Sequence, residues 1–188
     1  MQERIAELSP RSKARIAGVF YLLTILTGAF AAVFAGHRLG DGANLVASAC
    51  YVAVTLLLYA IFSPVDRSLS LIAAVFSLVG CAIGALGVFH LTPRYTPNSL
   101  VLFGVYCLMI GYLIFRSTFL PRILGVLMAF GGLGWLTFVS PELADYLSPY
   151  NLAPGILGEG ALTLWLLAKG VSEQRWREQA RAAEEWRL

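Results

Sequence analysis

One carboxylate stands out because it lies in the middle of an apolar stretch. The segment from Asn151 to Gly170 is long and apolar enough to cross a bilayer, and Glu159 lies near its centre. A charge at that depth costs at least ~2.5 kcal/mol. We therefore expect either a partner that offsets this cost or a retained proton. Thr163 follows Glu159 by one helical turn, so both side chains share a face that should point into the protein.

Polar groups in other parts of the chain are candidate partners for Glu159. Tyr106 and Tyr112 could donate phenolic hydrogen bonds, and His90 and Arg94 could reach in from one end of the spans. Together with Thr163 they form a candidate intramembrane polar site, suited to carrying a proton or coordinating a cation. The alternative is a protonated or tyrosine-bonded glutamic acid that only fixes helix packing. The residue types leave both interpretations open.

The two histidines, His37 and His90, lie near the ends of apolar stretches. If their helices were neighbours, the imidazoles and an acid such as Glu142, Asp145 or Glu159 would form a set of nitrogen and oxygen ligands. No H-x-x-x-H spacing supports such a metal site. The alternative is two hydrated imidazoles at the membrane surface, and we predict no metal and no cofactor.

Motifs of common membrane enzymes and channels are missing from the sequence. It has no G-x-S-G with a partner histidine, no H-E-x-x-H, no Walker loop and no TVGYG-like filter. Cys50, Cys81 and Cys107 fall inside apolar stretches and form no C-x-x-C pair, so we predict small packing residues. We name no catalytic residue.

Six apolar stretches must position these groups. Of the 188 residues, 58% are hydrophobic and only 13% are charged, whereas soluble domains carry about 25% charged residues. We predict an all-α polytopic membrane protein, a single bundle of six transmembrane helices within residues 16–170. The predicted spans are 16–36, 43–62, 69–91, 99–115, 123–139 and 152–168.

Lysine and arginine indicate the orientation. An even number of spans places both tails on one side, and all basic residues except Arg38 and Arg94 then lie on that side. Cytoplasmic loops carry such an excess. We predict that both termini are cytoplasmic and that the protein resides in the plasma (inner) membrane. The net charge of +3 therefore reflects orientation, and we expect the lipid bilayer and no nucleic acid as a partner.

The two tails, residues 1–15 and 171–188, are polar. In a C-terminal helix, Trp176, Ala180 and Ala183 would share one face at helical spacing. We predict a solvated amphipathic helix whose tryptophans touch lipid headgroups. The alternatives are docking of a protein partner or formation of a homo-oligomer.

Small residues predict where the spans approach each other most closely, because helices in lipid associate through close backbone contact. We expect such contacts on the third, fifth and sixth spans, and we predict that Gly84→Leu disrupts the bundle. The stripes are Ser77, Gly80, Cys81, Gly84 and Gly87; Gly125, Met128, Ala129 and Gly132, with Gly131 and Gly134 beside them; and Gly155, Gly158 and Gly160.

Several stretches carry a resemblance to a known family. They are RIAGVFYL (15–22), GYLIFRSTFLPRILGVL (111–127), LGE (157–159), LWLL (164–167) and RW (175–176). The chain resembles an uncharacterised family of bacterial six-span membrane proteins classed as a domain of unknown function. The resemblance covers nearly the whole chain. It implies a bacterial multi-pass membrane protein and brings no activity, substrate or catalytic residue with it.

Three classes of function fit these features. The first is a non-catalytic membrane subunit, regulator or protein that binds a lipid, small molecule or ion. The second is a small transporter that uses Glu159 for proton or cation coupling. The third is a membrane enzyme with an outer-face site of His37, His90 and an acid. A water-accessible pocket around Glu159 would favour transport, whereas a dry, tightly packed core would favour the first class.

Overall fold

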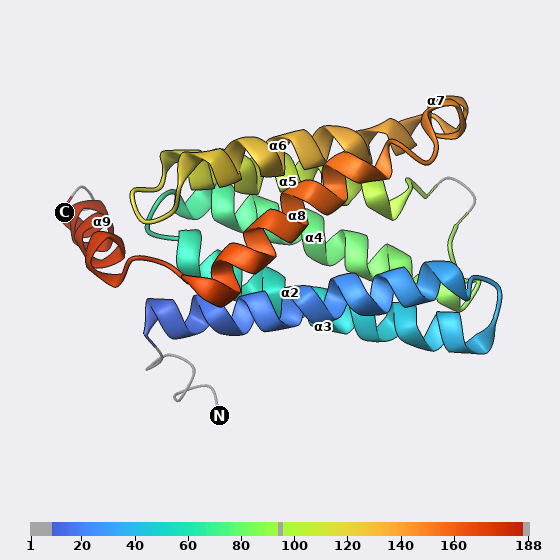
Figure 1. Ribbon diagram of the computed structural model, residues 1–188, viewed down its shortest axis with the longest axis horizontal. Coiled ribbons are helices and arrows are strands. Elements are labelled where there is room, and N and C mark those ends of the chain that lie inside the picture. Colours follow the sequence, from blue (N-terminus) through green and yellow to red (C-terminus); the bar gives the residue numbers. More distant parts are fainter. Residues whose placement is uncertain (1–8, 94–95, 186–188) are drawn as a thin grey trace.

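The computed structural model describes residues 9–93 and 96–185, and this part of the chain is helical throughout its regular structure (Figure 1). The long helices are α2 (Pro10–Val33), α3 (Arg38–Phe62), α4 (Arg67–Val88), α5 (Ser99–Arg116), α6 (Arg122–Leu136) and α8 (Leu152–Ala168). The shorter elements are η1 (Thr137–Val139), α7 (Pro141–Leu147) and α9 (Glu173–Glu185).

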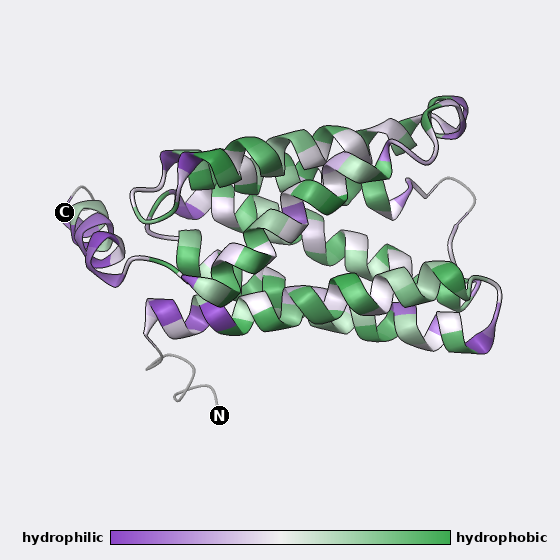
Figure 2. Cartoon of the chain, in the orientation of Figure 1, coloured by the Kyte–Doolittle hydropathy of each residue, from purple (hydrophilic) through white to green (hydrophobic). Residues whose placement is uncertain are grey.

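The hydropathy of the helices identifies a membrane protein. Five helices are long and apolar enough to cross a bilayer: α2, α3, α4, α5 and the continuous stretch of α6 and η1. Hydrophobic residues (green) run along these helices, and hydrophilic residues (purple) gather at the two ends of the bundle and on α9 (Figure 2). Helix α8 is apolar and has 17 residues, at the lower end of the range of about 17–25 residues that spans a bilayer. A sixth span therefore stays a prediction.

Several helices begin before the predicted apolar stretch, because capping decides where they start. Ser9 caps α2 and Pro10 occupies its first turn, so the helix begins at residue 10 rather than 16. Asp66 and Asn98 accept backbone hydrogen bonds of 2.9 Å in the first turns of α4 and α5.

The segment Gly40–Gly42, which precedes the predicted span 43–62, lies inside the first turns of α3. An added Cβ at Gly40 would meet the carbonyl of Phe34, so glycine permits the tight turn between α2 and α3. Gly36 adopts a φ of 82° in that turn, which ends α2 ahead of the predicted residue 36.

The helices form a closed ring. Each of α2 to α6 packs against the next helix in the chain, and α8 packs against both α6 and α2. In Figure 1, α8 crosses the bundle obliquely from α6 toward the start of α2. Buried side chains of the core come from all six helices, and Tyr21, Leu58, Tyr106, Met128 and Leu162 are among those with almost no exposed surface.

The closest helix contacts lie on α5, α6 and α8. An added Cβ at Gly111 would lie 2.7 Å from the carbonyl oxygen of Gly125, and one at Gly125 would lie 2.6 Å from that of Gly111. Gly104 and Gly132 repeat this reciprocal contact seven residues along each helix. Such approach is possible only without side chains, and it provides packing energy in lipid.

The predicted stripe on α4 is confirmed at Ser77, Gly80 and Cys81, which are buried, and is wrong at Gly84 and Gly87. At Gly84 the nearest atom to an added Cβ is 3.9 Å away, and at Gly87 nothing lies within 4 Å. Gly160 on α8 is equally open, whereas Gly80 packs against the ring of Phe103. Small residues recur at helical spacing on α4, but its neighbours there meet it through larger side chains.

Candidate functional site: a polar cluster around Glu159

Glu159 lies in the interior because α8 packs closely against α6. The residue is only 9% exposed. One turn before it, Gly155 leaves room for the indole of Trp135, which a Cβ at that position would meet directly. At Gly158 an added Cβ would meet the carbonyl of Leu127. These two glycines bring the Trp135 side chain of α6 within reach of the carboxylate.

Two donors from different helices converge on one carboxylate oxygen. Trp135 Nε1 donates to Glu159 Oε1 over 2.8 Å, and Cys107 Sγ of α5 lies 3.6 Å from the same oxygen. Oε2 receives no hydrogen bond from the residues that the structure describes. The acid therefore joins α5, α6 and α8 through one oxygen and keeps the other available as an acceptor.

Buried tyrosines surround this acid on the side of α2 and α3. The hydroxyl oxygens of Tyr21 and Tyr51 are 3.4 Å apart, and their rings meet edge to face with centroids 5.5 Å apart. Tyr51 also contacts Tyr106, with ring centroids 5.9 Å apart. The Tyr21 hydroxyl lies close to the Glu159 carboxylate. All helices of the ring except α4 thus contribute to the cluster.

Helix α4 makes a separate polar contact with α3. The hydroxyls of Thr55 and Ser77 are 2.6 Å apart, and both side chains are buried. The hydroxyl of Tyr106 is also buried, and none of the described residues forms a hydrogen bond with it. Buried polar groups are usually paired, so the Tyr106 hydroxyl, like Oε2 of Glu159, can still form a hydrogen bond.

The predicted site residues fall into two groups. Thr163 and Tyr106 are each 1% exposed and lie in the interior with Glu159. Thr163 donates its hydroxyl proton to the backbone carbonyl of Glu159 over 2.7 Å, so it does not bind the carboxylate. Tyr112 is half exposed, beneath the guanidinium of Arg116. Six residues separate the two tyrosines along α5, which turns their side chains about 120° apart.

The remaining candidates lie at the far end or outside the described residues. His90 is exposed just beyond the end of α4, with a φ of 55°, and therefore does not reach the interior acid. His37 is exposed at the start of α3. Arg94 lies outside the described residues. Among the residues described, no group of three His, Cys, Asp or Glu side chains gathers to hold a metal ion.

The sequence analysis missed Tyr21, Tyr51, Trp135 and Cys107 as neighbours of Glu159. Each lies inside an apolar stretch, where an aromatic or thiol side chain ordinarily packs. The glycine spacing on α8 predicted a close helix contact here, but not which side chain of the facing helix would fill it.

Four cavities of 280 to 730 Å³ lie elsewhere in the molecule, and Glu159 lines none of them. One opens beside α3, α4 and the segment before α5, and another lies between α6, α7 and α8. The other two adjoin the start of α2 and the links to α9. None of these four cavities reaches the polar cluster, and all four lie toward the ends of the bundle.

Helix α9 is hydrogen-bonded to the bundle, and the contact of its tryptophans with lipid headgroups stays a prediction, with Trp186 outside the described residues. Trp176 Nε1 donates to the carbonyl of Ile61 over 2.8 Å, and Gln179 Oε1 accepts from both the amide and the hydroxyl of Thr118. Arg175 donates to the Thr118 carbonyl over 3.3 Å. These bonds attach α9 to the end of α3 and to the loop between α5 and α6.

Comparisons with known proteins identify the family. A protein of Archaeoglobus fulgidus, described as an uncharacterised protein, is 28% identical over 127 residues, which cover 63% of this chain and 76% of the relative. No solved structure matches the chain. The family described as "Domain of unknown function (DUF4386)" matches residues 34–95 and 98–170. The match includes Cys107, Trp135 and Glu159, and the chain belongs to this family.

Proposed function

We propose that this chain is a non-catalytic multi-pass protein of a bacterial plasma (inner) membrane, with six spans and both termini in the cytoplasm. It would serve as a membrane subunit, regulator or lipid-binding protein. The observation that carries this proposal is the enclosed bonding of Glu159, whose oxygen joins three helices and lines none of the four cavities.

The bonding of Glu159 supports a role in holding the helices together. A hydrogen bond to a charged group contributes about 1.5–3 kcal/mol, and removing one partner of a buried pair costs the desolvation of the other. If the carboxyl retains its proton, the Trp135 bond still has an acceptor oxygen. In either state, the acid specifies how α8 sits against α5 and α6.

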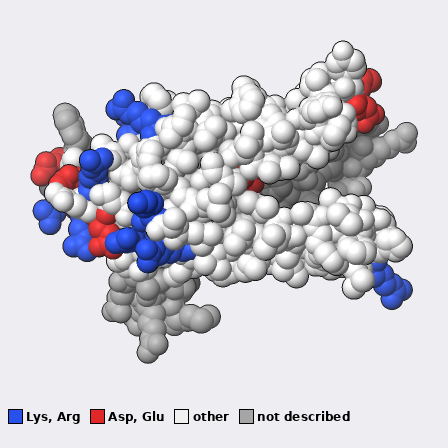
Figure 3. Space-filling model, viewed as in Figure 1, with Lys and Arg blue, Asp and Glu red and all other residues white. Residues whose placement is uncertain are grey.

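The charge distribution supports the proposed orientation. Lysine and arginine side chains gather at the end of the bundle that carries α9, and few charges lie along the middle of the face shown in Figure 3. Helix α9 contacts α2 at this same end. The excess of basic residues on one side is what the positive-inside rule expects of the cytoplasmic side.

Access of water to the cluster tests the proposal. Cys107 is fully buried against Glu159, so its own thiol reports whether water reaches the acid. With Cys50 and Cys81 replaced by alanine, we expect Cys107 in membrane vesicles to resist a charged, water-borne methanethiosulfonate reagent. Ser172→Cys, in the exposed link before α9, supplies the reactive control. Rapid modification of Cys107 in the folded protein would contradict the sealed core.

Proton or cation coupling at Glu159 is the second candidate. The specific observation in its favour is that Oε2 has no donor among the described residues, although the acid lies at the middle of α8. An ionisable residue inside a span commonly marks a proton or ion pathway. Proteoliposomes under an imposed pH gradient test this function. A proton flux that wild type supports and Glu159→Gln abolishes would favour the carrier over the non-catalytic subunit.

The outer-face enzyme has no comparable observation in its favour. His37 and His90 are both exposed, and neither forms a hydrogen bond or an ion pair through its side chain with the described residues.

A further inference from the structure

A cavity of about 730 Å³ lies between the start of α2, the loop between α5 and α6, and the link from α8 to α9. We call it the inner-end cavity. Its lining combines three cations, one acid and an apolar side, and the residues used below are Arg11, Lys169, Arg175, Glu173, Phe119 and Trp165. The cavity lies at the end of the bundle where basic side chains gather (Figure 3).

Gly170 brings two of these cations together. It adopts a φ of 67°, and its amide and that of Lys169 both bond the Trp165 carbonyl, which ends α8. An added Cβ at Gly170 would lie 3.0 Å from Cγ of Arg11. The stem of Arg11 therefore packs on the Gly170 backbone, next to Lys169. A turn that only glycine adopts easily thus brings the stem of Arg11 to the end of α8, and both Arg11 and Lys169 line the cavity, where an anion would offset their like charges.

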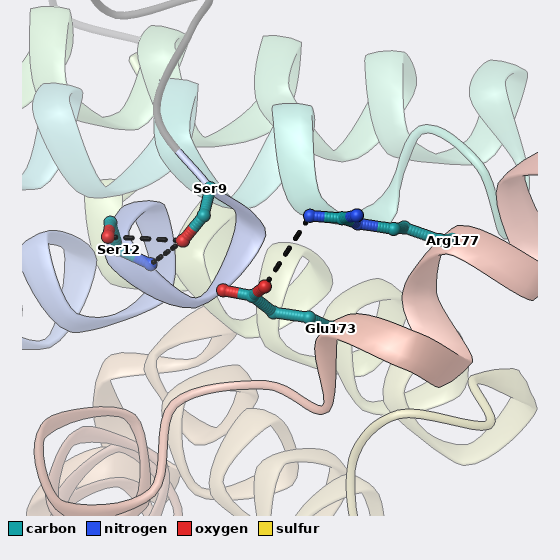
Figure 4. Close-up of polar contacts among 4 residues, drawn as sticks. All are labelled: Ser9, Ser12, Glu173 and Arg177. Atoms are coloured by element: carbon teal, nitrogen blue, oxygen red, sulfur yellow. Dashed lines mark hydrogen bonds and ion pairs between the residues drawn. The ribbon is translucent and has the colours of Figure 1, made fainter.

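The acid of the cavity does not neutralise these cations. Glu173 lies 3.6 Å from Arg177 of its own helix (Figure 4). This is the one ion pair among the described residues, so neither Arg11 nor Lys169 has an acidic partner there. Arg175 donates through Nη1 to a backbone carbonyl, which leaves its other N–H groups available. The lining thus has a net positive charge.

The apolar side narrows the chemistry of the ligand. Phe119 and Trp165 line the same cavity as the basic residues, so the cavity could hold a charged group beside hydrocarbon. Guanidinium groups bind phosphate in a planar fork, and lysine binds it as a point charge. We propose that the inner-end cavity binds a phosphate-bearing anion, supplied either by the headgroup of an anionic lipid or by a soluble phosphate. This inference goes beyond the proposed function and does not require the core around Glu159 to be sealed.

Binding can be measured on the full chain in nanodiscs. Phosphatidylcholine nanodiscs would receive either increasing fractions of phosphatidylglycerol or sodium phosphate at constant ionic strength, and the melting temperature would be recorded for each. We expect the anion to raise the melting temperature of wild type. In the variant Arg11→Gln/Lys169→Gln, we expect the apparent affinity to fall about 10-fold or more, because two charge-assisted contacts are lost.

A matched control separates a site from general attraction to negative lipid. Arg181→Gln removes a cation from an exposed position on α9 that does not line the cavity, and it should bind like wild type. A response to phosphatidylglycerol alone would identify the lipid headgroup, and an equal response to sodium phosphate would identify a soluble phosphate. If the double variant does not fold, Lys169→Gln alone replaces it, because Lys169 is exposed. Equal losses in the cavity variant and in Arg181→Gln, or no response to either anion, would overturn the proposal.

Discussion

The ionisable side chains in the middle of the bundle and those at its inner end differ in their partners. In the middle, a single acid is enclosed, and donors from α5 and α6 meet one of its oxygens. At the inner end, cations surround a cavity, and the acid there is bonded to its own helix. In our proposals, the acid in the middle fixes helix positions through hydrogen bonds, whereas the cations at the inner end bind a ligand. Substitutions in the middle should therefore change stability, and those at the inner end should change binding.

The largest effect should come from Gly158→Leu. A Cβ at this position would meet the backbone of Leu127, and backbone cannot yield as a flexible side chain can. We expect a loss of about 3 kcal/mol or more in the free energy of unfolding, or failure to fold. Unfolding in mixed micelles measures it. Gly160→Leu is the matched control, because nothing lies within 4 Å of its added Cβ. Equal losses at both positions would show that α8 does not pack on α6 in this register.

Substitution of Glu159 should have the next largest effect. Glu159→Leu leaves the Trp135 N–H without its acceptor, and we expect a loss of about 1–3 kcal/mol in unfolding free energy. Glu159→Gln keeps a carbonyl acceptor of the same shape and should recover most of that loss. Denaturant titration of the three proteins gives the comparison. Wild-type stability in Glu159→Leu would mean that the acid contributes nothing to packing, which would favour a role in ion handling.

Trp176→Phe should have a smaller and more local effect. The substitution keeps an aromatic ring, although a smaller one, and removes the N–H that bonds the Ile61 carbonyl, so we expect about 1 kcal/mol of global stability to be lost. Hydrogen exchange of α9 should become faster, while exchange in α5 and α6 stays unchanged. Unaltered protection of α9 would show that Gln179 and Arg175 alone hold it.

Tyr112→Phe should have the smallest effect. Tyr112 is half exposed and lies outside the polar cluster, and surface substitutions of this kind usually change stability by less than about 0.5 kcal/mol. Tyr21→Phe serves as the interior counterpart, because that hydroxyl lies within the cluster. If Tyr112→Phe lost more unfolding free energy than Tyr21→Phe, Tyr112 rather than Tyr21 would be the tyrosine in the interior cluster.

Hydropathy predicted the apolar length of the helices well. It missed first turns that are polar or basic. The apolar stretch 152–168 coincides with α8 and 99–115 differs from α5 by one residue. The start of α2 was missed because the cap at Ser9 lets a basic, polar turn join the helix. Whether the helices cross the membrane six times, and in which direction, stays a prediction.

The site was predicted only around its centre. Glu159 was identified because an acid is rare in such a stretch. Its hydrogen-bond donors are residue types that commonly pack in a core, so their identity does not indicate a polar partner. Cys107 was read as packing, and Trp135 was not considered. Which residue of α5 faces Glu159 depends on the rotation of the helix, and the choice between Tyr106 and Tyr112 could not be made from spacing alone. Glycine patterns had the same limit, since Gly84 and Gly158 look alike in sequence and differ in their neighbours.

The closure of the ring by α8 has a consequence for how the protein is made. The ribosome synthesises α2, α5 and α6 before α8, so Tyr21, Cys107 and Trp135 precede Glu159 into the membrane. If α8 is the sixth span, as proposed, it inserts beside groups that can already accommodate its acid, and the carboxyl need not remain in contact with acyl chains. A nascent chain stopped before residue 152 would hold an open slot between its first and fifth long helices, where a quality-control protease could recognise it.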